Sequence, residues 1–257
     1  MHDAPARSQA RRPFLTAAWH HLVMLSWPFA PDTLTPFLAH GTELDLWQGQ
    51  ALASIVAFDF RDTRVLGIPV PWHIRFPEVN LRFYVRRRAP DGFWRRGVIF
   101  IQEIVPRWAI ATVARTLYGE PYVARPMRQQ ITEPAGSPGR RTLEYAWRRR
   151  GRWERVAATT TTDPQAMTAG SIEEFIAEHY WGYTRRPGRA TLEYEVVHPR
   201  WRITPVTDYQ LDADLETLYP EPFSHTLRAA PLSAFVAEGS AVAVHRGQPV
   251  PFPNDFV

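Results

Sequence analysis

Proline occurs along the whole of this chain and limits the elements that the chain can form. There are 24 prolines among 257 residues. Proline lacks a backbone N–H and breaks the interior of helices, so frequent proline favours turns and short segments. A β-rich fold therefore suits this chain better than a helix bundle.

Strand patterns joined by turn residues agree with this expectation. The clearest hairpin runs from Val79–Arg88 through the turn Ala89–Gly92 into Phe93–Ile104. A second hairpin is expected between Glu43–Trp47 and Ala51–Phe60. Further strands are expected over residues 14–29, 121–131, 140–149, 152–162, 190–198 and 200–211, with a pair of strands within 223–246.

Helix signals are fewer than strand signals. Asp32 is a candidate cap for one short turn, and a helix is expected over residues 106–118, because proline is tolerated in a first helical turn. Ser171 opens a capping-box pattern that predicts a helix over residues 172–181.

The balance of these elements defines a fold class. Because strands dominate and hairpins outnumber crossovers, we expect an α+β fold with a mostly antiparallel, curved β-sheet and two or three short helices. The sequence shows no repeat, long linker or composition break. We therefore expect a flexible tail over residues 1–12 and a single domain over residues 13–257.

Two residue types are missing from the sequence. Without cysteine, the chain cannot form disulfides, cysteine-ligated metal centres or a catalytic thiolate. Without lysine, all 30 basic side chains are arginines, which stay protonated and cannot form an imine with a carbonyl substrate.

A cysteine-free chain fits a reducing compartment, so we expect a cytoplasmic protein. The pair Arg11–Arg12 resembles an export signal, but the segment Thr16–Pro31 is more typical of a structural strand.

Charge and hydropathy also narrow the range of partners. The formal net charge is +4, and arginine clusters such as Arg86–Arg88 and Arg148–Arg150 lie at the ends of expected strands, next to turns. A nucleic-acid surface would need such clusters on one face, so we expect no nucleic-acid partner. No apolar run is long enough for a membrane span, and no HExxH or phosphate-loop motif occurs, so no membrane, metal or cofactor is expected. Association of identical chains stays open.

The segment Phe76–Val85 carries the main candidate site. Strand side chains alternate between two faces, so Glu78, Asn80, Arg82 and Tyr84 share one face, opposite an apolar face that must pack on a core. A carboxylate, an amide, a guanidinium and a phenol in one row resemble the wall of a binding pocket. The same row would also be compatible with a face exposed to solvent.

Two other segments supply further candidates. Glu120 and Tyr122 lie where the helix expected before Gly119 gives way to a strand, and His198 lies at a strand end between Val197 and Pro199. Tyr122 could donate a proton or a hydrogen bond. We assign Glu78 and Tyr122 as catalytic candidates. The ligand-binding candidates are Asn80, Arg82, Tyr84, Glu120 and His198.

Several segments together resemble a known family. They are Phe14–Ala30, Phe58–Arg64, Pro77–Val85, Leu117–Tyr122 and His198–Trp201. These segments occur in the order found in the uncharacterised YqjF-like family, which is similar in fold to acetoacetate decarboxylase. The resemblance spans residues 13–246 and implies a β-rich cone around a small-molecule pocket. It implies no assigned activity.

The resemblance also shows where lysine would be needed. In acetoacetate decarboxylase a lysine after a proline forms the imine, and a second lysine beside it lowers the pKa of the first. If Pro121 occupies the place of that proline, Tyr122 and Val123 stand where the two lysines would be. The resemblance also implies that Glu78 corresponds to a carboxylate on a preceding strand. Decarboxylation through an imine is thus excluded.

Three functions are compatible with these residues. The first is an enzyme that acts on a small anionic or oxo-acid ligand, with Glu78 and Tyr122 as acid–base groups and Arg82 as anchor. The second is a carrier that binds such a ligand unchanged. The third is a structural β-protein with a filled cone, in which Glu78 and Arg82 form a salt bridge. A raised pKa of Glu78 would favour the enzyme, whereas an ion pair with Arg82 would lower that pKa.

Overall fold

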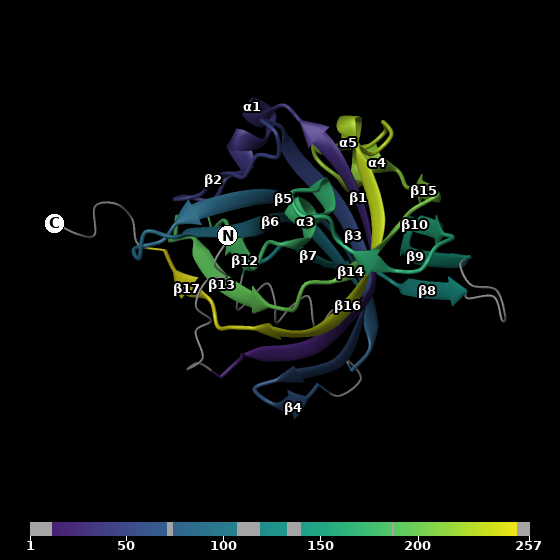
Figure 1. The fold of residues 1–257 in the computed structure, drawn as a ribbon, viewed down its shortest axis with the longest axis horizontal. Helices are drawn as coiled ribbons and strands as arrows, with labels where there is room; N and C mark the ends of the chain where they lie inside the picture. Colours follow the sequence, from purple (N-terminus) through teal and green to yellow (C-terminus); the bar gives the residue numbers. More distant parts are fainter. Residues whose placement is uncertain (1–11, 71–73, 107–118, 133–139, 187, 251–257) are drawn as a thin grey trace.

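Seven strands close into a barrel in the computed structural model of the chain, which describes residues 12–70, 74–106, 119–132, 140–186 and 188–250 (Figure 1). In order around the barrel, the strands are β16 (Ser233–Val244), β1 (Leu15–Phe29), β3 (Ala51–Val65), β5 (Phe76–Arg88), β6 (Trp94–Val105), β12 (Trp181–Thr184) and β13 (Leu192–Val197). The barrel closes where β13 pairs with β16. Neighbours are antiparallel except β6 and β12, which pair in parallel at only two positions.

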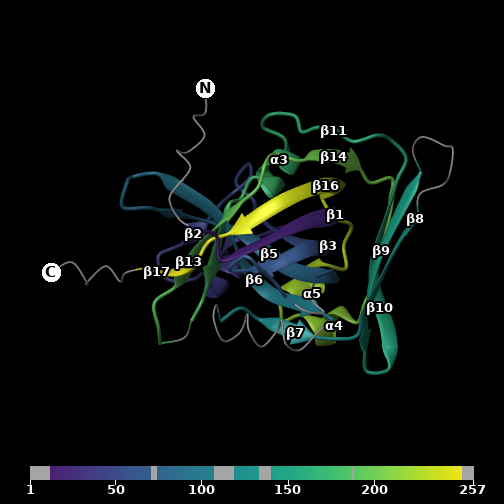
Figure 2. The same ribbon diagram turned by 90° about the horizontal axis from the view of Figure 1, so that it is seen from below.

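A second, four-stranded sheet packs against the outside of the barrel (Figure 2). Its strands, in order, are β15 (Asp208–Asp212), β10 (Arg152–Thr160), β9 (Arg141–Arg149) and β8 (Met127–Thr132). Two short helices, α4 (Leu215–Leu218) and α5 (Phe223–Thr226), contribute to the same layer.

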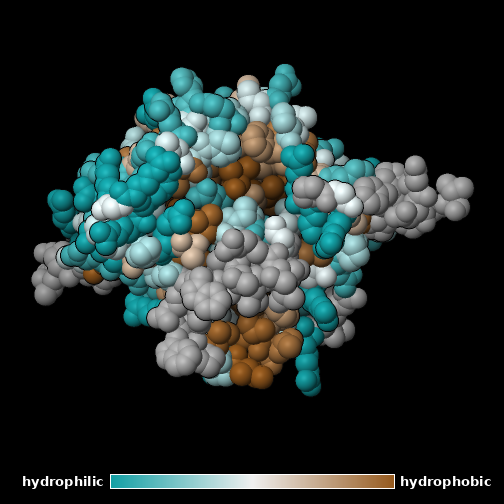
Figure 3. Space-filling view, turned by 180° about the vertical axis from the view of Figure 1, so that it is seen from behind, coloured by the Kyte–Doolittle hydropathy of each residue, from teal (hydrophilic) through white to brown (hydrophobic). Residues whose placement is uncertain are grey.

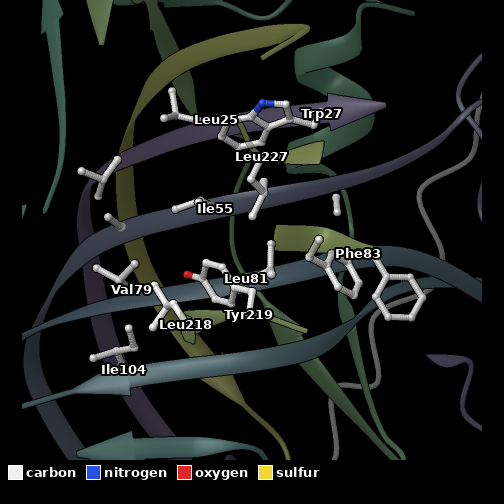
Figure 4. Close-up of a cluster of buried hydrophobic side chains, with 14 of the residues drawn as sticks. Leu25, Trp27, Ile55, Val79, Leu81, Phe83, Ile104, Leu218, Tyr219 and Leu227 are labelled. Carbon is white, nitrogen blue, oxygen red and sulfur yellow. The ribbon is translucent and has the colours of Figure 1, made fainter. Parts of the chain in front are cut away.

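An apolar core fills the space between the barrel and this outer layer. Figure 4 shows Leu25, Ile55 and Leu81 of the barrel beside Leu218 and Leu227 of the helical region. Burial of each such side chain stabilises the fold by roughly 1.5–3 kcal/mol. The outer core therefore fixes which face of each barrel strand points outward.

The opposite faces of the barrel strands point inward and form a second core. Met24, Val56, Phe58 and Phe235 are buried there. The helix α3 (Ile172–Ala177) contributes Phe175, Ile176 and Ala177 to this core, and Figure 2 shows it at one end of the barrel beside β16. The barrel interior is thus partly filled by apolar side chains, with polar residues in the rest.

The remaining elements are short and lie at the edges. They are α1 (Pro31–Leu34), the 3-10 helix η1 (Thr35–Phe37), β2 (Glu43–Leu44), β4 (Ile68–Pro69), β7 (Tyr122–Ala124), β11 (Gln165–Ala166), β14 (Arg202–Pro205) and β17 (Gln248–Pro249). Figure 3 shows an apolar patch at the bottom of the molecule, where Figure 1 places β4. Leu66 and Ile68 of this β3–β4 hairpin are 70% and 69% exposed. No described helix is long and apolar enough to cross a membrane.

The fold class predicted from the sequence is confirmed, because strands dominate and nearly all pair antiparallel. The main hairpin is present as β5 and β6. Of the predicted hairpin between Glu43–Trp47 and Ala51–Phe60, only the tight turn is present, closed by the bridge between Trp47 and Gln50, because β2 pairs with β5. Both edges of β3 are already occupied, by β1 and β5.

Two helix signals were placed inaccurately. The cap of α1 is Ala30 rather than Asp32, which lies in the first turn, where a negative charge favours the helix dipole. Ser171 does cap α3 by accepting from the backbone N–H of Glu174. However, α3 ends at Ala177, because the chain must become extended to join the barrel as β12. The helix predicted over residues 106–118 lies almost entirely outside the described residues, as does most of the predicted tail.

Three strand boundaries also differ from the prediction. The strand predicted over residues 121–131 is divided into β7 and β8. The segment 200–211 supplies β14 to the barrel sheet and β15 to the outer sheet. The pair of strands predicted within 223–246 is instead helix α5 followed by the single strand β16. In each of these three segments the chain passes from one layer to the other. Local strand patterns do not indicate where such a passage occurs.

Candidate functional site

The polar face of β5 points into the barrel. Glu78, Asn80 and Tyr84 are buried, and Arg82 is partly exposed. The alternate residues of the same strand pack in the outer core, so the pleat of the strand directs these four to the other side. The hydroxyl of Tyr84 is hydrogen-bonded to Oγ of Ser54 at 2.6 Å. The row is therefore part of an interior surface rather than a solvated face.

Three buried glutamates come together at one end of this row. Glu103 of β6 stands opposite Asn80 in the β5–β6 register. Glu120 lies just before β7, which pairs with β6 through Tyr122 and Glu103. Glu78, Glu103 and Glu120 are 3%, 2% and 4% exposed. Neighbouring strands thus bring three carboxyl groups into one water-poor region.

Both carboxyl oxygens of Glu78 accept a hydrogen bond. Nδ2 of Asn80 donates to Oε1 at 3.0 Å, and the hydroxyl of Tyr122 donates to Oε2 at 3.3 Å. The two catalytic candidates from the sequence therefore meet in the structure. Their contact orients the carboxyl of Glu78 toward β7.

The other two carboxyl groups differ in how they are held. Oε1 of Glu120 accepts from Oγ1 of Thr184 at 2.6 Å and from the hydroxyl of Tyr194 at 2.8 Å. Oε2 of Glu103 is buried and has no hydrogen-bond partner among the described residues. An acceptor left in this way is available to a bound molecule.

Burial raises the pKa of all three carboxyl groups. It is the largest cause of the rise from 4.5 to about 7 for the pKa of Glu78 and for that of Glu120. Burial, together with the charges of Glu120 and Glu78, raises the pKa of Glu103 well above its usual value. Because three close carboxyl groups cannot all ionise away from water, the cluster retains protons at neutral pH.

Tyr122 lies between two of these acids and stays protonated. Burial, reinforced by the negative charges of Glu103 and Glu78, raises the pKa of its phenol well above the usual value. Tyr122 therefore acts as a hydrogen-bond donor at physiological pH rather than as a base.

Arg82 has no carboxylate partner among the described residues. Its Nε is buried without a hydrogen bond, and its guanidinium carbon lies 5.8 Å from the ring centre of Tyr84. The alternative in which Glu78 and Arg82 form a salt bridge is not present in the structure, since Glu78 bonds Asn80 and Tyr122. Arg82 only lowers the pKa of Glu78 through its charge, against the larger effect of burial.

The ring of His198 is positioned by stacking on Trp201 and not by a hydrogen bond to the three glutamates. Its ring is stacked on Trp201 with centroids 4.0 Å apart, and Nδ1 lies 2.9 Å from the carbonyl oxygen of Pro199. Burial is the largest cause that lowers the pKa of His198 to about 4, and the charge of Arg82 acts in the same direction. His198 is therefore neutral and lies within electrostatic reach of Arg82.

A cavity of about 230 Å³ adjoins the cluster on the side of Glu120. Phe100, Gly119 and Thr184 also line it. It lies where β6 and β12 separate beyond their two paired positions. A larger hollow of about 540 Å³ lies in the outer layer, beside Trp27 and Leu215, and contains none of the candidate residues. Of the candidate residues, Glu120 alone lines the smaller cavity, whereas Glu78, Arg82 and Tyr122 do not.

The sequence did not identify Glu103 as part of the cluster. Glu103 occurs in an ordinary strand pattern, and only the β5–β6 register brings it to Asn80. That register could have been traced from the hairpin turn, but the bulge between Leu81 and Arg82 shifts it by one residue.

Among the described residues, no group of three His, Asp or Glu side chains is placed to hold a metal ion.

Comparison with known sequences gives a family. The DUF2071 family, described as an uncharacterized conserved protein, matches residues 16–241. The uncharacterized protein YqjF of Bacillus subtilis (strain 168) is 27% identical over 184 residues, which is 70% of this chain and 70% of that protein. The resemblance to the YqjF-like family predicted from the sequence is confirmed.

Solved structures agree on the fold. An acetoacetate decarboxylase-like enzyme from Sphingomonas wittichii RW1 has a TM-score of 0.64 at 14% identity, covering 96% of this chain and 99% of that one. Acetoacetate decarboxylase from Legionella pneumophila has a TM-score of 0.63 at 13% identity, covering 96% and 92%. The enduracididine biosynthesis enzyme MppR, complexed with pyruvate, has a TM-score of 0.61 at 16% identity, covering 95% and 93%. At these identities the likeness concerns the fold alone.

Proposed function

The chain belongs to the DUF2071 family of uncharacterized conserved proteins, and we propose that it is a lysine-independent acid–base enzyme acting on a small anionic or oxo-acid ligand. The observation that carries this proposal is the group of three buried, proton-retaining glutamates near an arginine that has no carboxylate partner among the described residues. Such a combination of perturbed acids and a free anion-binding group is typical of catalytic sites.

Arg82 is the proposed anchor for the ligand. A guanidinium group can bind a carboxylate through two parallel hydrogen bonds, and it stays charged when partly buried. Its Nε is already desolvated and unpaired, so a bound carboxylate would satisfy it. MppR, which has a similar fold, was solved with the oxo acid pyruvate.

Glu78 is the proposed proton-transfer group. A carboxyl group with a pKa of about 7 is present in both forms at neutral pH, so it can take a proton from a carbon next to a carbonyl and return it. Tyr122 would turn its single O–H from Glu78 to the carbonyl oxygen as negative charge develops on that oxygen. Activation of the carbonyl then relies on hydrogen bonding, since no lysine is present to form an imine.

The experiment is exchange of the methyl protons of pyruvate in deuterated buffer, followed by proton NMR. The wild-type chain is expected to accelerate exchange. Glu78→Gln should lower that rate about 100-fold or more, because it removes the base while keeping the shape of the side chain. Tyr122→Phe should also lower the rate. Glu238→Gln, a change at an exposed glutamate, is the matched control and should have no effect.

Binding measured on the same proteins separates the alternatives. Arg82→Ala should weaken pyruvate binding about tenfold or more, through loss of charge-assisted hydrogen bonds. Pyruvate that binds without exchange would indicate a carrier. Failure of pyruvate and related oxo acids to bind at all would indicate a barrel filled by its own side chains. Unchanged exchange in Glu78→Gln would contradict the assigned base.

A further inference from the structure

A buried carboxylate–imidazole pair lies near the Tyr84 end of the polar row. His179 is located between α3 and β12, and its Nε2 lies 3.1 Å from Oδ2 of Asp45. That oxygen also accepts from Nε of Arg96 at 2.5 Å. The His179 side chain is only 1% exposed. The pair is therefore withdrawn from bulk water.

Asp45 determines which nitrogen of His179 carries the proton. Burial alone would raise the pKa of Asp45, but its contacts with His179 and Arg96 outweigh this and lower it. An ionised carboxylate can only accept, so Nε2 must donate to it. Burial is the largest cause that lowers the pKa of His179 to about 4, so the ring is neutral. Nδ1 is left as a lone-pair acceptor.

Nδ1 of His179 is buried and has no hydrogen-bond partner among the described residues. Three side chains of the proposed site contain atoms in the same state, namely Oδ1 of Asn80, Nε of Arg82 and Oε2 of Glu103. Buried polar atoms are normally paired, and an unpaired one is costly. Of the ten such atoms among the described residues, these four belong to the proposed site and to His179 beside it, where a bound molecule would complete the hydrogen bonding.

His179 and Arg82 both lie against the ring of Tyr84. The ring centres of His179 and Tyr84 are 4.7 Å apart, and the guanidinium carbon of Arg82 lies 5.8 Å from the Tyr84 ring centre. The charge of Arg82 also contributes to the low pKa of His179. The two side chains therefore share a neighbour on the inner face of β5.

We infer that His179, oriented by Asp45, accepts a hydrogen bond from a hydroxyl group of the ligand that Arg82 anchors. An ammonium donor would be repelled by Arg82 and Arg96, which favours a neutral donor, and a hydroxyl is the smallest such group that an oxo acid can carry. The substrate class becomes a small oxo acid that also carries a hydroxyl group. This inference rests on the proposed function and assigns to His179 a part in specificity.

The test compares three ligands of similar size by titration calorimetry. They are hydroxypyruvate, pyruvate and 3-fluoropyruvate, whose fluorine resembles a hydroxyl in size but cannot donate. The wild-type chain should bind hydroxypyruvate about tenfold more tightly than the other two. In His179→Phe this preference should disappear while pyruvate affinity stays. His225→Phe changes an exposed histidine on α5 and should keep the preference.

A spectroscopic measurement on the wild-type chain covers the case in which His179→Phe does not fold. Nitrogen-15 NMR should find His179 with its proton on Nε2, and the Nδ1 signal should move on addition of hydroxypyruvate but not pyruvate. His179→Gln would identify that signal. Equal affinity for the three ligands, or a proton on Nδ1, would overturn the inference while leaving the proposed function intact. Binding of none of the three would overturn both.

Discussion

Among single residues, the three glutamates of the barrel interior determine what chemistry is available. Each would be an ordinary surface acid with a pKa near 4.5 if it were solvated, and burial moves the pKa of Glu78 and of Glu120 to about 7. The nearby Tyr122 holds its proton and can only donate. The barrel interior therefore combines acids that retain protons near neutral pH with a fixed donor, while Arg82 supplies a positive charge.

The raised pKa of Glu120 predicts how stability depends on pH. Because the folded chain binds this proton more tightly than the unfolded chain, the contribution is complete below pH 4.5 and is lost as pH rises through about 7. The loss is on the order of 3 kcal/mol. Glu120→Gln keeps an acceptor for Thr184 and Tyr194 but cannot ionise. Urea denaturation near pH 5 and near pH 7.5 should show a smaller fall in unfolding free energy for this variant.

Glu238→Gln is the control for this measurement, since Glu238 is exposed. It should lose as much stability as the wild-type chain over the same pH interval. If Glu120→Gln also shows the wild-type loss, Glu120 is ionised in the folded protein at pH 5 and its assigned place in the cluster is incorrect.

The shared face of the β5 residues can be predicted from the sequence. The residues that contact them from other elements cannot. Glu78, Asn80 and Tyr84 follow from alternation along one strand, which is a local property. Glu103 enters through strand register, and His179 and Asp45 through a contact that spans 134 positions of the chain. No local pattern encodes such contacts, so the unpaired acceptors of the site became visible only in the folded chain.

At the scale of elements, the junction between β6 and β12 places Glu120. These two strands pair in parallel at only two positions, opposite Gly97 and Gly182. A Cβ at Gly97 would overlap the carbonyl oxygen of Trp181, and one at Gly182 would overlap the ring of Tyr194. The glycines therefore allow a close approach that brings Tyr194 over β12, where its hydroxyl reaches Glu120.

Gly182→Ala tests this junction. The added methyl group should displace the ring of Tyr194 and destabilise the fold by about 1–3 kcal/mol, as overpacking in a core does. Urea denaturation measures the change. Tyr194→Phe is the control, because it keeps the ring and removes only the hydroxyl, and it should cost about 1 kcal/mol. A Gly182→Ala chain as stable as the wild type would mean that the strands approach less closely than described.

Local elements were easier to predict than pairings. The β5–β6 hairpin follows from turn residues between strand patterns and is present, and the strands predicted over residues 140–149 and 152–162 pair as β9 and β10. The position of β2 beside β5, and the division of the segment 200–211 between two sheets, depend on which sheet edges are free. Edge availability is a property of the assembled barrel, so it cannot be inferred from the segment itself.

At the scale of the whole molecule, a barrel is supported from outside by a second sheet, so its interior is free to hold polar groups. The outer core stabilises the wall, and the inner face of β5 does not need to be apolar. The fold is that of acetoacetate decarboxylase-like proteins, but the chain has no lysine with which to form an imine. The same architecture therefore presents acids, a phenol and an arginine in place of an amine.

The most direct test of this account is a carbon-13 NMR titration of the glutamate side-chain carboxyl groups between about pH 4 and pH 9. Glu78→Gln, Glu103→Gln and Glu120→Gln identify the three signals. The account predicts that these three titrate well above the exposed glutamates and that protons remain on the cluster at pH 7. If all three titrate near 4.5 with the rest, the barrel interior holds no proton-exchanging acid and the proposed chemistry is contradicted.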